Sequence, residues 1–267
     1  MNDKKFIRTK IEKSLRKLLK ITYLSGHALT RFKVLCNMVS SLILRGKSQV
    51  SDLALGNPDS KKYGSKLQQL KRWLKNEKVS YDSLYTPYIK PLLTCLSKIG
   101  SLVFSIDGSQ VGSGCMCLMF SVIYKNKAIP VIWSVHRQKK GHLSEKVHQD
   151  LLKRLIDLVP IGSKVTVVGD GEFDGCDFQK DILAQKWNHV LRTGKNVLIT
   201  ENNWDNFNPK NVKLLQGTSL FFEQIEFSQR KHLTNLFLKN TPTLWVGDVV
   251  STQRMHIFVY EKSKTHI

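Results

Sequence analysis

The sequence of 267 residues has no long hydrophobic run and no apolar leader segment. Its densest apolar stretch, residues 34–44, is interrupted by Asn37, Ser40 and Ser41. It therefore falls short of the roughly 18 apolar residues that a membrane-spanning helix needs. Residues 1–19 carry charge too regularly to contain the hydrophobic part of a secretory signal. These absences predict a soluble, cytoplasmic protein with no membrane partner.

C-x-x-C cysteine pairs and several catalytic motifs are also missing. The five cysteines are scattered, odd in number and contain no C-x-x-C pair, which supports neither a disulfide framework nor a zinc ribbon. The chain lacks the G-x-S-x-G nucleophile motif, the P-loop motif and H-E-x-x-H. We expect reduced thiols and none of the three enzyme classes that those motifs define.

Acidic residues are scarce: 21 Asp and Glu face 42 Lys and Arg, a formal net charge of +21. Residues 1–90 hold 20 Lys and Arg against 6 Asp and Glu, whereas residues 91–267 hold 22 against 15. Hydrophobic residues still make up 41% of the chain, enough for a buried core, so this is not a disordered basic tail. Such a surface favours nucleic acid as the partner, with a solvated helical face or an anionic membrane as alternatives.

Residues 1–99 have the hydrophobic spacing of helices, with apolar residues at helical intervals over 7–19 and 29–43. Residues 51–55 and 65–74 predict a short helix, a turn and a longer basic helix. This order is compatible with a helix-turn-helix DNA reader, although three-helix packing without DNA would give the same pattern. On the longer helix the basic face predicted to contact DNA consists of Lys66, Lys71, Arg72 and Lys75.

From residue 101 the pattern changes to short β-rich runs. We expect strands over 101–106, 115–124, 128–135, 164–169 and 189–192, with helices over 142–158 and 174–186 between the later ones. This order predicts a mixed α/β layer whose antiparallel strands come first and whose helical crossovers follow. Beyond residue 197, alternating runs over 219–227, 244–250 and 256–260 predict a β-rich extension.

Two aspartates follow predicted strands: Asp107 comes after the first run and Asp170 after the fourth. Open α/β sheets place their sites at such strand ends. A partly buried carboxylate there would need a partner, and a divalent cation is the natural one. The two together predict a metal site, although Asp-Gly is also an ordinary turn sequence. Glu172 and Asp174 are candidates for supporting roles beside Asp170, and Asp174 also fits the N-cap of the next helix.

Three segments carry a family resemblance: FSIDGS around Asp107, KKGH over residues 139–142, and VVGDGEFD around Asp170. Their order and spacing resemble the ribonuclease H-like core of DDE-type insertion-sequence transposases of the IS-four type. Residues 66–87 are similar to the helical DNA-binding region that precedes that core. The resemblance implies a helical DNA-binding region over 1–99, a ribonuclease H-like core over 100–195 and the start of a β-rich insertion over 196–267.

The activity that this resemblance implies is cut-and-paste DNA transposition. In that family two aspartates and a glutamate hold two Mg²⁺ ions, which serve an in-line displacement on DNA phosphate. Asp107 would be the first aspartate and Asp170 the second. The implied partners are double-stranded DNA at the transposon's terminal inverted repeats and a second copy of the chain, in a bacterial or archaeal cell. Lys139 and Lys140 are candidates for contacts with backbone phosphates, or else belong to a solvated loop.

The third acidic residue is where the resemblance departs from the family pattern. The family's Y-x-x-R-x-x-x-E-x-x-x-x-x-x-K pattern does not occur before Ile267. Glu201 and Asp205 have the spacing seen in simpler relatives, but they lie in a turn-rich segment. We therefore expect a shortened transposase that ends before the final catalytic helix, with low or absent metal affinity and turnover.

Two other functions remain open. The residues Gly169, Asp170, Gly171 and Asp174 match the G-D-G-x-x-D motif of haloacid-dehalogenase-like phosphatases, with Asp107 as the nucleophile. That family needs a second aspartate two positions later, where this sequence has Ser109. The other alternative is a non-catalytic protein that binds transposon ends through its helical region.

Overall fold

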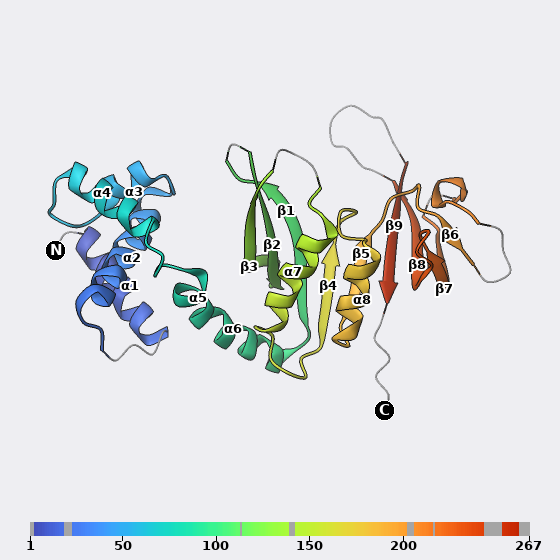
Figure 1. Cartoon of the computed structure of the whole chain (residues 1–267), viewed down its shortest axis with the longest axis horizontal. Coiled ribbons are helices and arrows are strands. Elements are labelled where there is room, and N and C mark those ends of the chain that lie inside the picture. The colour runs from blue at the N-terminus through green and yellow to red at the C-terminus, as the bar shows by residue number, and fades with distance from the viewer. Residues whose placement is uncertain are drawn as a thin grey trace. The chain divides into compact units, whose positions relative to one another are not determined.

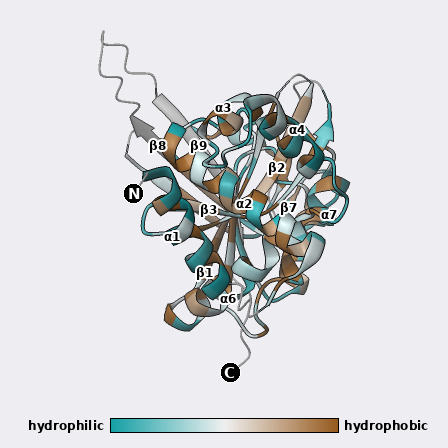
Figure 2. Cartoon of the chain, turned by 90° about the vertical axis from the view of Figure 1, so that its left-hand side faces the viewer, coloured by the Kyte–Doolittle hydropathy of each residue, from teal (hydrophilic) through white to brown (hydrophobic). Residues whose placement is uncertain are grey.

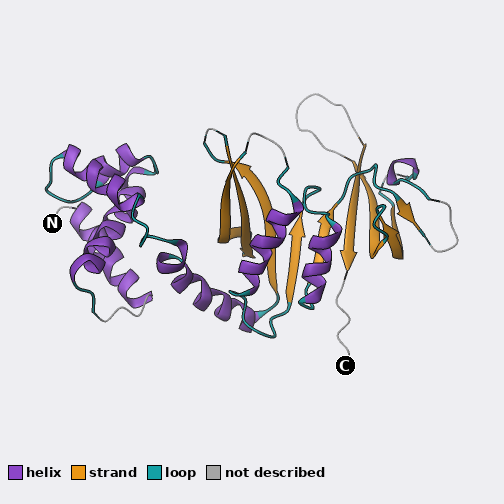
Figure 3. Ribbon diagram, in the orientation of Figure 1, coloured by secondary structure: helices purple, strands orange, loops and turns teal. Residues whose placement is uncertain are grey.

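The computed structural model describes residues 3–18, 23–112, 114–138, 142–201, 206–215, 217–242 and 253–261. The chain divides into two compact units, Met1–Leu92 and Leu93–Ile267. Helices make up the first unit, and strands dominate the second (Figure 3). This confirms the predicted α/β class with a helical N-terminal region and a mixed sheet. Among the described helices, none combines the length and hydropathy needed to cross a bilayer.

The first unit packs around helix α2 (Gly26–Arg45), which contacts α1 (Asp3–Leu18), α3 (Val50–Gly56) and α4 (Tyr63–Leu74). Hydrophilic and hydrophobic residues are interspersed along α1 (Figure 2). The core between α2, α3 and α4 consists of Val34, Leu53, Ala54, Leu70 and Trp73. The helices α3 and α4 stand where the sequence predicts a short and a longer helix. The short α5 (Tyr81–Leu84) and then α6 (Thr86–Ile99) follow, and α6 continues into the second unit.

The second unit is built on one sheet. Its first five strands are β1 (Leu102–Gln110), β2 (Cys115–Tyr124), β3 (Lys127–Arg137), β4 (Val165–Gly169) and β5 (Asn188–Arg192). Helix α7 (Glu145–Ile156) joins β3 to β4, and α8 (Cys176–Ala184) joins β4 to β5. The remaining elements are β6 (Ile199–Thr200), the 3₁₀ turn η1 (Pro209–Asn211), β7 (Ser219–Phe227), β8 (His232–Pro242) and β9 (Gln253–Glu261).

The strand order of this core is β3-β2-β1-β4-β5. The strands β1, β2 and β3 are antiparallel neighbours, while β4 pairs parallel with β1 and β5 parallel with β4. The parallel strands need crossover connections, which α7 and α8 supply. This order matches the mixed α/β layer predicted from the hydrophobic pattern, and it is the ribonuclease H-like arrangement that the family resemblance implies.

The β-rich extension prolongs the same sheet. β5 pairs antiparallel with β9, and the order continues as β8, β7 and β6. The predicted strand over 219–227 is confirmed as β7, whereas the predicted run over 244–250 lies outside the described residues. The three-part domain division at residues 99 and 195 stays a prediction.

Both crossover helices of the core lie on one face of its sheet (Figure 1). Gly169 at the end of β4 is surrounded on that face by Ile106, Phe173 and Leu191, whose side-chain atoms lie 2.9–3.1 Å from the position that a Gly169 Cβ would take. The ring of Phe173 in turn lies 4.9 Å from that of His148 on α7. The absence of a side chain at Gly169 thus allows β4 to end in close contact with this core.

The first strand differs from its prediction. β1 does not end before Asp107 but continues to Gln110, because residues 107–110 pair with residues 116–119 of β2. Only the pairing with β4 ends at Ile106. Asp107 therefore lies within a strand, at the point where its parallel neighbour ends.

Candidate functional site

Asp107 and Asp170 lie at the same edge of the sheet. β1 and β4 are in parallel register up to the pair Ile106 and Gly169, and the next residue on each strand is one of the aspartates. Adjacent strands lie about 4.8 Å apart. The register therefore places the two residues that the sequence singles out at neighbouring positions of the sheet, although they are far apart along the chain.

Strand alternation directs Asp107 away from the crossover helices. The next residue, Gly108, faces Glu172, whose Oε2 lies 3.3 Å from the position that a Gly108 Cβ would take. Glu172 accepts the backbone N–H of Leu143, which precedes α7, at 2.9 Å. Because consecutive strand residues face opposite sides of a sheet, Asp107 faces the side opposite to α7.

Each carboxylate accepts one hydrogen bond from a nearby residue. The hydroxyl of Ser109 donates to Asp107 Oδ2 at 3.0 Å, and the backbone N–H of Glu172 donates to Asp170 Oδ1 at 3.1 Å. Both aspartates are exposed. The prediction that the two carboxylates are partly buried and need a partner is therefore wrong. β4 ends at Gly169, so no described strand covers β1 beside Asp107 on that side.

The donor set fits a hard divalent cation. Mg²⁺ prefers oxygen ligands and usually takes one or two protein carboxylates, with water and substrate phosphate completing the shell. Across the described ranges, no cluster of three or more His, Cys, Asp and Glu side chains is placed to hold a metal. Glu201 follows β6 and belongs to no such cluster, and Asp205 lies outside the described residues.

A basic residue stands beside the aspartates. β4 and β5 are paired up to Gly169 and Leu191, so Arg192 occupies the position on β5 that corresponds to Asp170. Its side chain is exposed and forms no ion pair with any described residue. The sequence analysis did not identify Arg192 as a site residue. Only the register of β5 with β4 places it next to Asp170.

Glu172 supports the site from the helix side. Its carboxylate lies 3.5 Å from His142 Nδ1 and 3.8 Å from His148 Nε2. Burial lowers the pKa of His148, and the nearby Glu172 opposes that effect. The ring of His148 is therefore neutral at physiological pH, and its contact with Glu172 is not an ion pair. Glu172 links the turn after Asp170 to the start of α7.

The prediction that Asp174 is the N-cap of α8 is wrong. The Oδ2 atom of Asp174 accepts a hydrogen bond from the Thr193 hydroxyl, and burial raises the pKa of the Asp174 carboxyl. The N-cap is Gly175. The cap is instead supplied across the fold by Glu145 of α7, whose Oε1 accepts the backbone N–H groups of Asp177 at 2.7 Å and Phe178 at 3.0 Å.

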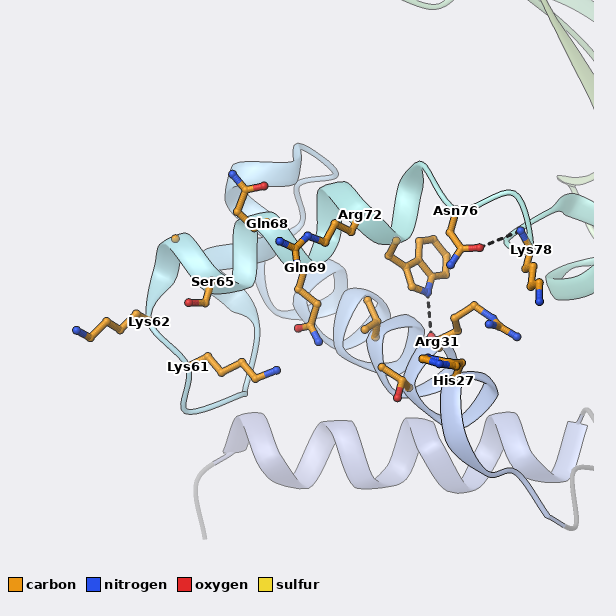
Figure 4. Close-up of a pocket in the computed structure, with 14 residues that line it drawn as sticks. His27, Arg31, Lys61, Lys62, Ser65, Gln68, Gln69, Arg72, Asn76 and Lys78 are labelled. Carbon is orange, nitrogen blue, oxygen red and sulfur yellow. Dashed lines mark hydrogen bonds between the residues drawn. The ribbon is translucent and has the colours of Figure 1, made fainter.

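The basic side chains predicted to contact DNA have different surroundings. Lys66 donates from Nζ to the carbonyl of Asn57 at 2.9 Å, which ties α4 to the loop before it. Lys71 and Lys75 are exposed. Arg72 lines a hollow of about 1240 Å³ beside α2 and α4 (Figure 4). Lys139 and Lys140 lie outside the described residues.

The strand order and the two aspartates at the end of β4 and within β1 define the class of this protein. It is a mixed α/β protein with a ribonuclease H-like sheet and an exposed pair of carboxylates. No family model and no curated protein matches the sequence. Among solved structures, a piggyBac transposase in a synaptic complex with hairpin DNA aligns with a TM-score of 0.42 and 13% identity. The alignment covers 97% of this chain and 60% of that transposase chain, and so weak a likeness carries no argument about function.

Proposed function

We propose that this chain is a DNA transposase of the DDE type, related to the IS-four type, whose Asp107 and Asp170 hold a divalent ion for phosphoryl transfer. The observation that supports this most directly is the register of β1 and β4, in which the two aspartates follow Ile106 and Gly169. A bound metal ion at such a pair supplies Lewis-acid stabilisation of a phosphate oxygen. The ion assigned here is Mg²⁺, and the substrate is double-stranded DNA at transposon ends.

The residues of this chain have separate roles in the proposal. The two carboxylates bind the metal, and Ser109 and the Glu172 backbone orient them through the hydrogen bonds described above. Arg192 is proposed to contact a DNA phosphate, because its exposed guanidinium occupies the adjacent position on β5. The basic side chains Lys66, Lys71, Arg72, Lys75, Lys139 and Lys140 are proposed to contact DNA. Assembly as a dimer on DNA is part of the same proposal.

Turnover is proposed to be slow. Among the described residues the edge offers two carboxylates where the family uses three, and a weaker site holds its metal less tightly. The test is nicking of supercoiled plasmid with Mg²⁺ or Mn²⁺. We expect slow nicking that stops in EDTA and in Asp107→Ala, while the exposed Asp157→Ala, at the end of α7, retains it. Nicking that persists in Asp107→Ala would contradict the proposal.

Two further measurements, DNA binding and aryl phosphate hydrolysis, address the other candidate functions. DNA binding without nicking under any metal would favour a non-catalytic DNA-binding protein, which the basic first unit supports. Hydrolysis of an aryl phosphate that requires Asp107 would favour a phosphatase. The antiparallel pairing of β1 with β2 and of β2 with β3 argues against that last candidate, and so does the serine at position 109.

A further inference from the structure

The hollow in the first unit has an unusual composition for a cavity. It is lined by α2, by α4 and by the segments that flank α4. Its lining includes the basic side chains of Arg31, Lys61, Lys62, Arg72 and Lys78, together with His27, and no described aspartate or glutamate belongs to it. None of these five Lys and Arg side chains forms an ion pair with a described residue. The hollow is therefore a concave surface with uncompensated positive charge.

The packing of Trp73 holds the two helices that form this hollow. Its indole Nε1 donates to the backbone carbonyl of Arg31 at 2.9 Å, which ties α4 to the start of α2 (Figure 4). Trp73 is only 9% exposed and belongs to the core of the unit. The basic side chains thus project from a fixed framework, because the contact that sets the distance between the helices is buried.

Polar side chains on one face of α4 also line the hollow. Ser65, Gln68, Gln69 and Arg72 recur at intervals of three and four residues. Figure 4 shows Lys61 and Gln69 extending into the space between α4 and α2, whereas Lys62 and Gln68 point away from it.

We infer that this hollow binds the phosphate backbone of duplex DNA, through Arg31, Lys61, Arg72 and Lys78. Its volume exceeds the ~300–1,000 Å³ of clefts that hold small ligands, which favours a macromolecule. Single-stranded nucleic acid is recognised by stacking on exposed aromatic rings. The only aromatic residue other than His27 in the lining is Trp73, which is buried, so a duplex fits better.

This inference rests on the proposed function in taking DNA as the ligand, but it requires neither metal nor the two aspartates. It also narrows the basic face predicted from the sequence. Of that face, Arg72 lines the hollow, Lys66 is engaged with Asn57, and Lys71 and Lys75 do not line it. The hollow, and not the exposed lysines of α4, therefore carries most of the binding.

The test is the affinity of the full chain for a labelled 20-base-pair DNA duplex of mixed sequence, measured by fluorescence anisotropy in EDTA over a series of NaCl concentrations. We expect Lys61→Ala and Arg72→Ala each to weaken binding at least fivefold and to reduce the slope of log K against log salt by about one. Lys71→Ala and Lys75→Ala remove the same charge from the exposed face of α4 and should weaken binding less than the two variants in the hollow. Lys33→Ala, at an exposed lysine of α2 outside the hollow, is the matched control, with a change below twofold. Thermal unfolding of each variant shows whether it is still folded. Arg72→Gln keeps a polar side chain of similar length without the charge, and it should lose affinity as Arg72→Ala does.

The possible outcomes separate failure of the hollow as the binding site from failure of DNA as the partner. If the wild type binds duplex and only the Lys71 and Lys75 variants lose affinity, the hollow is not the site, although DNA remains the partner. If the matched single strand or an RNA duplex binds as tightly as the DNA duplex, the assignment of the ligand is wrong. If the wild type binds no DNA, both the hollow and the DNA partner of the proposed function are overturned.

Discussion

His189 shows how burial sets the charge of a single residue. It lies on β5, is fully buried, and neither of its ring nitrogens has a hydrogen-bond partner in the structure. Burial lowers the pKa of His189 to about 4, and nearby His232 contributes to the same effect. Burial also lowers the pKa of His232, and the positive charge of nearby Lys180 lowers it further. Both rings are therefore neutral in the folded protein at physiological pH.

These two histidines predict a loss of stability in mild acid. An unfolded histidine titrates near pH 6.5, so between pH 6.5 and about 4 the unfolded chain binds a proton that folded His189 does not. The contribution of neutral His189 is complete above pH 6.5 and declines as the pH falls toward 4, by at most about 3 kcal/mol. Urea unfolding between pH 7.5 and 4.5 measures it.

The comparison that isolates the effect uses His189→Leu. We expect this variant to unfold with a flatter pH dependence than the wild type, whatever its stability at neutral pH. An unaltered pH dependence in His189→Leu would mean that other groups dominate acid unfolding.

At the scale of elements, α7 and α8 are joined by an unusual cap. Glu145 in the first turn of α7 accepts two N–H groups from the first turn of α8, which has no capping side chain of its own. Gly175 makes room for this, because a Cβ there would collide with the Glu145 side chain. Arg230, in the turn between β7 and β8, pairs with both Glu145 and Asp177. The network joins the crossover helices to the β-rich extension.

Removing the cap should destabilise the second unit. Glu145→Ala leaves two helix N–H groups without an acceptor, and loss of an N-terminal cap typically costs about 1–2 kcal/mol. Asp150→Ala is the matched control on the same helix, because its exposed ion pairs with Lys146 and Lys153 are worth less than ~1 kcal/mol. Chemical denaturation compares the two. Equal losses in both variants would show that the cap has no special weight.

Elements and site differ in how far the sequence could predict them. The strands of the core follow from apolar runs that end near Asp107 and Asp170, because local hydrophobic patterns determine them. Contacts between residues far apart in the sequence leave no such local hydrophobic pattern. Asp174 has the position of a helix cap, yet Thr193 engages it and Glu145, 32 residues before Asp177, supplies the cap. Only the register of β1 with β4 could show that the two aspartates adjoin.

At the scale of the whole molecule, charge and fold are unevenly divided between the units. The first 90 residues carry a net charge of +14, and the remainder carries +7. The total charge predicts a polyanionic partner, but the surface that meets it depends on packing. Arg31 and Arg72 are far apart in sequence and line one hollow only because Trp73 docks α4 on α2. The charges along α4 taken alone would predict that Lys71 and Lys75 contribute to DNA binding as much as Arg72 does.

The central claim is that Asp107 and Asp170 share one divalent ion, and binding of Mn²⁺ measured by electron paramagnetic resonance tests it most directly. We predict that Asp107→Asn and Asp170→Asn each remove most of the Mn²⁺ binding, that the double variant loses no more than either single one, and that Asp157→Asn binds as the wild type does. Binding that is unchanged in both single variants, or losses that add in the double variant, would contradict a shared site.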